Sequence, residues 1–246
     1  MVEDEELEPT LCSPSERVAP NPCPKTSNPL SMKIISVHVG EPREIFFQGR
    51  IISTGIFKAP VATRVRVSAL NIEGDRQADL TVHGGPSKAI YVYPSEHYPF
   101  WRRELGDEFL AAGAFGENLT SEGLSETAVH IGDLVSIGTA EFVVTQPRLP
   151  CFKLGVRFER LDMVRRFQQS GRSGFYLAVR REGVIAAGDE VHLVAREQHG
   201  VSVADIVRLY TSHGREQALL RRAVALAALP ESWRNHFRPL LQTSQG

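Results

Sequence analysis

Short runs of β-strand character separated by glycine turns constrain the fold of this chain most strongly. In residues 63–70, Val65, Val67 and Ala69 alternate with polar neighbours, which is the period-two pattern of a half-exposed strand. Similar runs predict strands at residues 33–39, 89–93, 174–180 and 190–195, and hairpins at residues 45–52 and 134–145. Many short strands and few helices predict a mainly β fold, a closed or nearly closed β-barrel with a few peripheral helices.

Helical patterns are few among the predicted strands and predominate in the residues that follow the last strand. Ser95 is a candidate cap for a helix over residues 96–105, and residues 161–169 show a second helical pattern. Towards the C-terminus, apolar side chains recur at helical spacing in three short runs, which begin near Ser202, Glu216 and Pro230. We therefore expect a barrel domain over residues 32–198 and a three-helix bundle over residues 199–246. Such a bundle is too small to be stable unless it packs on the barrel.

The first 31 residues differ in composition from the rest of the chain. They contain six prolines and few large apolar side chains, so they cannot bury enough surface to offset chain entropy. We predict a disordered tail over residues 1–31. The acidic start lacks the basic and apolar regions of a secretory signal, and no apolar run approaches the length of a membrane span. We therefore predict a cytoplasmic protein without a membrane partner.

Charge and cysteine content exclude further classes of protein. The net charge of −1 over 246 residues offers no general attraction to nucleic acid, so no nucleic-acid partner is expected. Three cysteines, two of them in the predicted tail, cannot build a disulfide framework, and no CxxC pair suggests a zinc site. The motifs of serine hydrolases, zincins and dinucleotide-binding proteins are also missing from the sequence.

The remaining cysteine, Cys151, lies in the stiffest segment of the chain. Pro147 and Pro150 restrict the backbone of residues 146–154 and predict an extended loop. Arg148 and Lys153 stand close to Cys151 in sequence, and nearby cations favour the thiolate, the form that binds metals or attacks electrophiles. The alternative is a half-buried structural cysteine, because cysteine is often buried for packing alone.

Four further polar clusters accompany this loop. Lys58 follows a glycine turn and precedes a proline, so its ammonium group is held on a constrained loop, although a single lysine is usually a surface charge. Residues 73–79 form a polar loop around a glycine, for which a plain turn is the alternative. Residues 83–88 combine paired glycines, whose N–H groups can curl around an anion, with His83 and Lys88.

The fourth cluster spans residues 113–120, where glycines flank Phe115 and are followed by Glu117 and Asn118. The carboxylate and the amide of these two residues could recognise a polar heterocycle, and the same loop could equally be a corner of the barrel.

Taken together and in this order, the five clusters resemble the MOSC domain. The segments that carry the resemblance are 54–58, 73–79, 83–86, 113–120 and 147–154, and each has the residue types described above. The C-terminal helices, from Val201 onward, resemble the three-helix domain of the bacterial YiiM-like branch of that family.

The resemblance implies a β-barrel that binds the molybdenum cofactor, a phosphorylated pterin dithiolene (molybdopterin) carrying molybdenum. It makes Cys151 the metal ligand and a catalytic residue, in agreement with the preference of soft metals for thiolate. His83 would be a second catalytic residue near the metal or the substrate, with a contact to the cofactor phosphate as the alternative. The cofactor phosphate and the pterin edges would then contact Lys58, Gly84, Gly85, Lys88, Glu117, Asn118 and Arg148.

The implied activity is reduction of N-hydroxylated compounds such as hydroxylaminopurine, hydroxylamines and amidoximes. The chain has no cysteine quartet for an iron–sulfur cluster, so a separate reductase must donate the electrons. The helical bundle is a candidate for docking that reductase or for forming a homodimer. Two rival interpretations remain open: a cofactor carrier or sulfur-transfer protein without turnover, and a barrel whose cysteine is inert.

Overall fold

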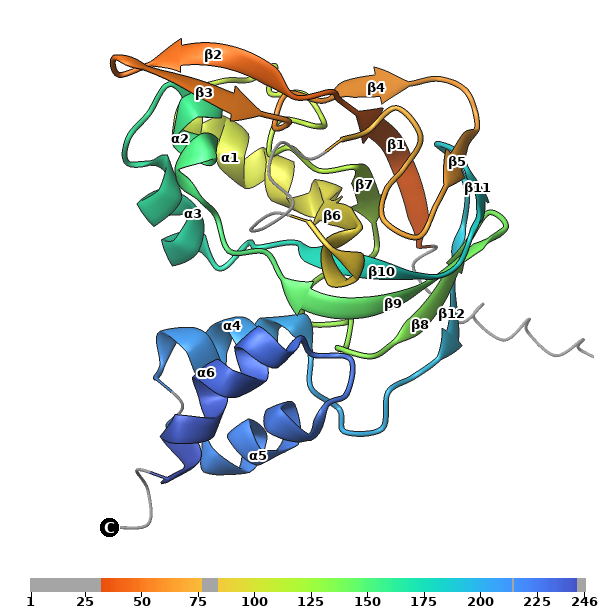
Figure 1. Ribbon diagram of the computed structural model, residues 1–246, viewed down its shortest axis with the longest axis vertical. Helices are drawn as coiled ribbons and strands as arrows, with labels where there is room; N and C mark the ends of the chain where they lie inside the picture. The colour runs from red at the N-terminus through yellow and green to blue at the C-terminus, as the bar shows by residue number, and fades with distance from the viewer. Residues whose placement is uncertain (1–31, 77–83, 214, 243–246) are drawn as a thin grey trace, which may run out of the picture.

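An eight-stranded sheet forms the centre of the computed structural model, which describes residues 32–76, 84–213 and 215–242. Its strands follow the order β12-β8-β9-β10-β6-β7-β1-β4 (Figure 1). All neighbours pair antiparallel except β6 and β7, which are parallel. The strands are β1 (Lys33–Val39), β4 (Ala59–Val61), β6 (Ile90–Pro94), β7 (Leu119–Glu122), β8 (Leu134–Ile137), β9 (Ala140–Pro147), β10 (Phe175–Arg181) and β12 (Val191–Ala195).

The sheet curls strongly, but its ladder does not close into a barrel. The start of β1 meets the segment before β12 through an isolated bridge between Lys33 and Glu190. The amide of Val191 also donates a 2.8 Å hydrogen bond to the carbonyl of Met32. Among the described strands, β12 and β4 nevertheless remain the two edges of the sheet. The prediction of a mainly β fold is therefore confirmed, and the prediction of a closed barrel is not.

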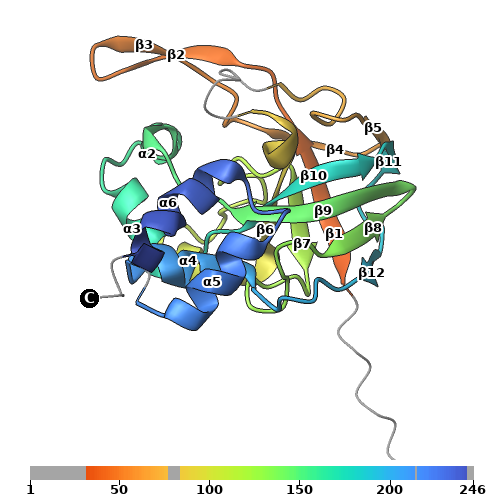
Figure 2. The same cartoon turned by 60° about the horizontal axis from the view of Figure 1, so that its bottom comes forward.

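Two small sheets flank the large one. The predicted hairpin at residues 45–52 is confirmed as β2 (Arg43–Phe47) and β3 (Arg50–Thr54), which project from the body of the molecule (Figure 2). Gln48 and Gly49 join them with φ of 49° and 75°, the two positive angles that a tight hairpin turn requires. The strand predicted at residues 63–70 is shorter than expected; β5 (Val65–Val67) pairs with β11 (Gly183–Ile185).

The helices of the β domain agree only partly with the sequence predictions. A 3₁₀ turn, η2 (Ser95–His97), precedes α1 (Tyr98–Leu105), so the predicted cap by Ser95 is wrong: no side-chain cap hydrogen bond starts either helix. The second predicted helix is confirmed as α3 (Met163–Ser170).

A further helix, α2 (Phe152–Phe158), starts where the sequence predicted an extended loop. Cys151 itself is extended, with φ −116° and ψ 174°, and is the residue directly before α2. Pro150 restricts only the residues before the helix, which is why it does not prevent α2 from forming. The loop prediction thus fails from Phe152 onward.

The three predicted C-terminal helices are confirmed as α4 (Val203–Thr211), α5 (Gln217–Ala225) and α6 (Glu231–Gln242). Ser202 caps α4: its hydroxyl accepts from the Asp205 amide at 3.1 Å, and the Asp205 carboxylate accepts from the Ser202 amide at 2.9 Å. Buried side chains of the bundle share one apolar core with the sheet, as a bundle of this size requires. No helix in the described ranges is long and apolar enough to cross a membrane.

A second, aromatic core lies under the other end of the sheet. Tyr93, Trp101, Phe115 and Phe167 are fully buried there and pack ring against ring, with centroids 4.7 to 6.0 Å apart for the pairs in contact. This core joins α1, α3 and the loop before β7, and it supports the floor of the cavity described next.

Candidate functional site

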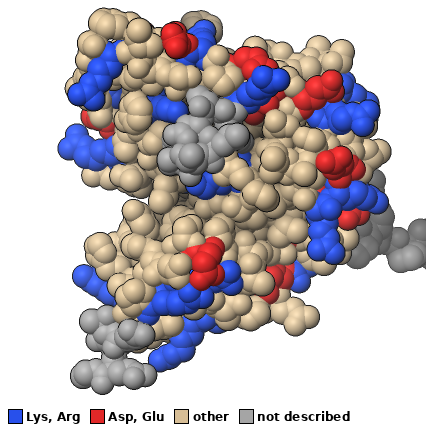
Figure 3. Space-filling model, in the orientation of Figure 1, with Lys and Arg blue, Asp and Glu red and all other residues tan. Residues whose placement is uncertain are grey.

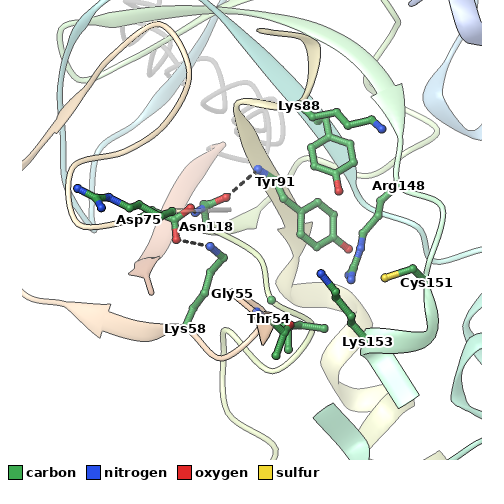
Figure 4. A pocket seen from close by; sticks show the side chains of 14 residues that line it. Thr54, Gly55, Lys58, Asp75, Lys88, Tyr91, Asn118, Arg148, Cys151 and Lys153 are labelled. Carbon is green, nitrogen blue, oxygen red and sulfur yellow. Dashed lines mark hydrogen bonds and ion pairs between the residues drawn. The ribbon is translucent and has the colours of Figure 1, made fainter. Parts of the chain in front are cut away.

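A cavity opens where the ends of β3, β6 and β9 approach the start of α2 (Figure 4). It brings together five of the predicted site residues, which come from distant parts of the chain. The lining consists of Thr54, Gly55, Ile56, Lys58, Asp75, Arg76, Lys88, Tyr91, Gly116, Asn118, Arg148, Cys151, Lys153 and Tyr176. Figure 4 shows the side chains of Cys151, Arg148 and Lys153 converging on the space beside Tyr91.

The charge of the lining is strongly positive. Its cations are Lys58, Arg76, Lys88, Arg148 and Lys153, and Asp75 is the single carboxylate among the described lining residues. Low-dielectric walls strengthen the field of these cations within the cavity, so the site attracts anions although the whole chain is nearly neutral.

Lys58 and Asp75 form a buried ion pair in this cavity, with side chains 7% and 1% exposed. Asp75 also accepts from the Gly40 amide at 2.9 Å and from the Asn118 side-chain amide at 2.8 Å. Burial lowers the pKa of the Lys58 ammonium, and the charge of Asp75 acts in the opposite direction. Asp75 therefore fixes Lys58 at the cavity wall. The sequence did not predict this role, because there Asp75 is only one polar residue of the loop over residues 73–79.

Asn118 lines the cavity, but its side chain is bonded within the protein. Its Nδ2 group donates to Asp75, and its Oδ1 atom accepts from the Tyr91 amide at 3.1 Å. The Asn118 backbone bonds to Tyr91 and His38 at 2.8 and 2.7 Å. Asn118 thus ties β6 and β1 to the ion pair, and no further contact is needed to explain its position.

Glu117, the neighbouring residue, is fully buried and lies outside the cavity lining. Its carboxylate accepts from the hydroxyls of Tyr98 and Thr120 and from the amides of Gly113 and Phe115. The three bonds other than that to Tyr98 measure 2.8 to 3.1 Å. The carboxylate therefore closes the turn over residues 113–117, and the structure separates it from the site to which the sequence assigned it.

Arg148 is buried, 8% exposed, at the back of the cavity. Its Nη1 group donates to the Phe115 carbonyl at 2.6 Å, and its guanidinium carbon lies 4.6 Å from the centre of the Tyr91 ring. Burial alone would lower the pKa of Arg148, but Tyr91, Tyr176 and Cys151 together raise it above its ordinary value. The guanidinium thus stays charged and interacts electrostatically with Cys151, which is partly exposed. The thiolate form of Cys151 stays a prediction.

Only the end of the described part of the glycine-rich segment before β6 lines the cavity. Gly84 and Gly85 precede the 3₁₀ turn η1 (Pro86–Lys88) and are not among the lining residues, whereas Lys88 reaches the cavity. Burial lowers the pKa of Lys88. His83 lies outside the described residues, so its predicted catalytic role stays a prediction.

Two residues of the lining had no signal in the sequence. Tyr91 and Tyr176 lie on the neighbouring strands β6 and β10, with ring centroids 5.3 Å apart. Each occupies an ordinary strand position, so only the register of the two strands shows that their rings meet beside Arg148.

Comparison with known families agrees with this geometry. The model of the MOSC domain matches residues 79–192, and the model of the YiiM-like 3-alpha helix domain matches residues 201–243. The fold and the site thus define a MOSC-domain protein followed by a YiiM-type helical domain.

Relatives that match most of the chain extend the similarity to the region before residue 79. Protein YflK of Bacillus subtilis is 43% identical over 83% of this chain and 92% of its own length. Protein YiiM of Escherichia coli is 36% identical over 73% and 81%. The crystal structure of YiiM from Geobacillus stearothermophilus superposes with a TM-score of 0.72 at 38% identity, over 85% of this chain and 99% of that one. The chain belongs to the YiiM-like family of MOSC-domain proteins, which confirms the resemblance seen in the sequence.

A longer relative carries a functional name. A protein of Gibberella moniliformis called "Reductase" is 34% identical over 72% of this chain, but the match spans only 32% of that protein.

Proposed function

We propose that this protein binds the molybdenum cofactor and reduces N-hydroxylated compounds with electrons from a separate reductase. The observation that carries the proposal is one thiol, Cys151, in a cavity lined by five cations. A phosphorylated cofactor is anionic and fits such a lining, and a soft metal fits the thiolate. Membership of the MOSC family and the name of the fungal relative support the same class of chemistry.

The donor set fits a metal that arrives with its own ligands. Within the described parts of the chain, no group of three or more His, Cys, Asp or Glu side chains could hold a metal ion. A dithiolene cofactor brings sulfur ligands to its metal, so one protein thiolate completes the set. Cys151 is the cavity residue that would supply it.

The cations of the cavity have two roles in this proposal, cofactor binding and proton delivery. Arg148, Lys88 and Lys153 would hold the phosphate and pterin, because they face the same space as Cys151 (Figure 4). Gly55 allows two parts of the cavity wall, its own backbone and that of Arg76, to lie close together. A Cβ atom at position 55 would stand only 2.6 Å from the Arg76 carbonyl oxygen. Lys58 would hold a proton at Nζ, and burial, which lowers its pKa, makes that proton easier to release inside the cavity.

The overall reaction balances with two electrons and two protons: R–NHOH becomes R–NH₂ and water as the N–O bond breaks. The bound cofactor supplies the two-electron chemistry. The protein binds the reactants and delivers protons at the cavity wall.

The test is to purify the protein from cells that make the cofactor and to measure molybdenum per chain. Reduction of hydroxylaminopurine is then followed with an artificial electron donor. We expect stoichiometric metal and turnover in the natural chain, and a loss of bound metal of about tenfold or more in Cys151→Ser. Serine is a favourable residue at a helix start, so this variant should fold normally.

The outcome separates the rival interpretations. Bound molybdenum without turnover of any N-hydroxylated compound would favour a cofactor carrier or sulfur-transfer protein. Full metal content and full activity in Cys151→Ser would show that the cysteine is inert and would end the proposal that it is a ligand.

A further inference from the structure

A groove runs beside the cofactor cavity, between the β domain and the helical bundle. Figure 3 shows the surface indented where these two parts meet. The groove is lined by Lys88, Gln146, Pro147, Leu149, Tyr176, Tyr210, Ser232, Trp233 and His236. Four of these nine residues come from the bundle, to which the proposed function has so far given no role at the site.

The groove adjoins the cavity that holds Cys151. Lys88 and Tyr176 line both spaces, and they stand between them. Leu149 and Pro147 line the groove on the same short segment that carries Arg148 and leads to Cys151. A ligand in the groove would therefore lie directly beside the cofactor cavity.

The wall on the side of the bundle is aromatic. Tyr210 of α4 lies with its ring centroid 5.5 Å from that of Trp233 and 5.3 Å from that of His236, both on α6. The Trp233 indole N–H is already bonded to the Gln146 side-chain carbonyl at 2.7 Å, which fixes its ring. His236 is exposed and Tyr210 partly exposed, so both rings can contact a ligand.

The opposite wall contributes one cation, Lys88, together with Gln146, Tyr176 and the apolar Pro147 and Leu149. Lys88 stands at the inner end, and no carboxylate is present among the described residues that line the groove. A cationic ligand would lack a counter-ion there, whereas a neutral or electron-rich ring can stack on aromatic side chains and approach a lysine favourably.

We propose that this groove is the substrate-binding part of the site and that it takes a planar aromatic heterocycle. Tyr210 and His236 contact the ring, and its N-hydroxyl substituent points past Lys88 and Tyr176 into the cofactor cavity. This inference rests on the proposed function and gives it a specificity element. It assigns the bundle to substrate selection; a role in reductase docking or dimer formation stays a separate prediction.

The kinetic test compares an aromatic with a non-aromatic substrate on the cofactor-loaded protein. In Tyr210→Ala and His236→Ala, we expect the KM for hydroxylaminopurine to rise about three- to tenfold, the value of one aromatic contact. The KM for hydroxylamine, which has no ring, should change less than about twofold. Asn235→Ala is the matched control, because Asn235 is exposed on α6 next to His236 but does not line the groove.

A binding test gives a readout that is independent of turnover. The chain has two tryptophans; Trp101 is fully buried in the aromatic core, and Trp233 lines the groove. Adenine, the amine that hydroxylaminopurine reduction would produce, should quench the fluorescence of Trp233 in a saturable manner. The quenching should weaken in Tyr210→Ala and His236→Ala and persist in Asn235→Ala.

The two proposals fail in different ways. The substrate groove would be overturned by equal KM changes for both substrates, or by adenine quenching that is absent or unchanged in the groove variants. Turnover in the same protein would still uphold the proposed function. Saturable, variant-sensitive adenine binding in a protein that neither holds molybdenum nor turns over would uphold the groove as a heterocycle site and overturn the reductase.

Discussion

The indole nitrogen of Trp233 lies 2.7 Å from the side-chain carbonyl oxygen of Gln146, and this hydrogen bond is buried. It joins α6 of the helical bundle to the end of β9, one residue before the Pro147–Cys151 segment. The bundle and the proposed metal ligand are thus held by the same short piece of backbone. A change at this contact should affect both the stability of the chain and the shape of the groove.

Trp233→Phe should destabilise the protein by about 1–3 kcal/mol. The phenyl ring keeps most of the packing but leaves the Gln146 oxygen without its donor in a buried place, which costs roughly its desolvation free energy. Urea unfolding followed by circular dichroism measures the change.

The double variant Trp233→Phe with Gln146→Met provides the control. The Ser87 carbonyl, to which Gln146 also donates, keeps its bond from the Thr145 hydroxyl at 2.6 Å, so no buried acceptor is left alone. We expect the double variant to be more stable than Trp233→Phe by about 1 kcal/mol. Additive losses would show that the bond contributes nothing by itself.

Glu117→Gln should destabilise the protein by about 3 kcal/mol, because an amide nitrogen would face hydrogen-bond donors in the buried turn. Thermal unfolding of the cofactor-free chain measures this loss. Glu122→Gln is the control: its carboxylate is 46% exposed in a surface ion pair with Lys33, so the change should be below about 1 kcal/mol. A Glu117→Gln protein that keeps its stability but loses the cofactor would show that Glu117 binds the cofactor, as the sequence predicted.

Stability should fall in alkaline solution. Burial raises the pKa of Tyr91, Tyr93 and Tyr98 above the ordinary value of about 10. The unfolded chain releases these protons near that pH while the folded chain keeps them, so the stability present below about pH 10 is lost as the pH rises further. Each tyrosine contributes about 1.4 kcal/mol per pH unit to the slope of the unfolding free energy.

Tyr91→Phe isolates one of these contributions. Above about pH 10, the slope of its unfolding free energy against pH should be smaller than that of the natural chain by about 1.4 kcal/mol per unit. Denaturant unfolding at several alkaline pH values gives both slopes. Identical slopes would mean that Tyr91 ionises as readily in the folded chain as in water.

Gly116→Ala should destabilise the protein by about 2–4 kcal/mol. Gly116 has φ +77°, and a Cβ atom there would stand 2.7 Å from Ile56 Cγ1 at the cavity wall. Gly49 has nearly the same φ, +75°, with nothing within 4 Å, so Gly49→Ala carries the backbone cost alone, about 1–2 kcal/mol. Equal losses in the two variants would show that the wall yields to the added methyl group.

Lys153→Gln should weaken cofactor retention by about tenfold, because it removes a cation from the cavity lining. The loss should shrink at high salt, which already screens the charge. Molybdenum per chain after dialysis at low and high salt measures both effects. Lys33→Gln removes an equal charge from a surface ion pair and should leave retention unchanged.

The sequence allowed much of the local structure to be predicted, although the predicted cap at Ser95 and the predicted loop after Cys151 were wrong. The hairpin at Gln48 and Gly49, the capped helix after Ser202 and the strand at residues 33–39 all depend on neighbours within a few positions, and all are confirmed. The order of the polar clusters was also enough to identify the family and to place Cys151, Arg148 and Lys58 at one site.

Contacts between distant residues were decided by the tertiary structure alone. Glu117 and Asn118 are neighbours with similar polarity, yet one closes a buried turn and the other lines the cavity, because only Asn118 meets Asp75 from another loop. Contacts between distant residues also determine three other features: the open sheet edge, the pairing of Tyr91 with Tyr176 and the groove between α6 and β9. Turn and strand patterns are encoded by adjacent residues, whereas strand register and domain packing depend on surfaces that meet only after the chain has folded.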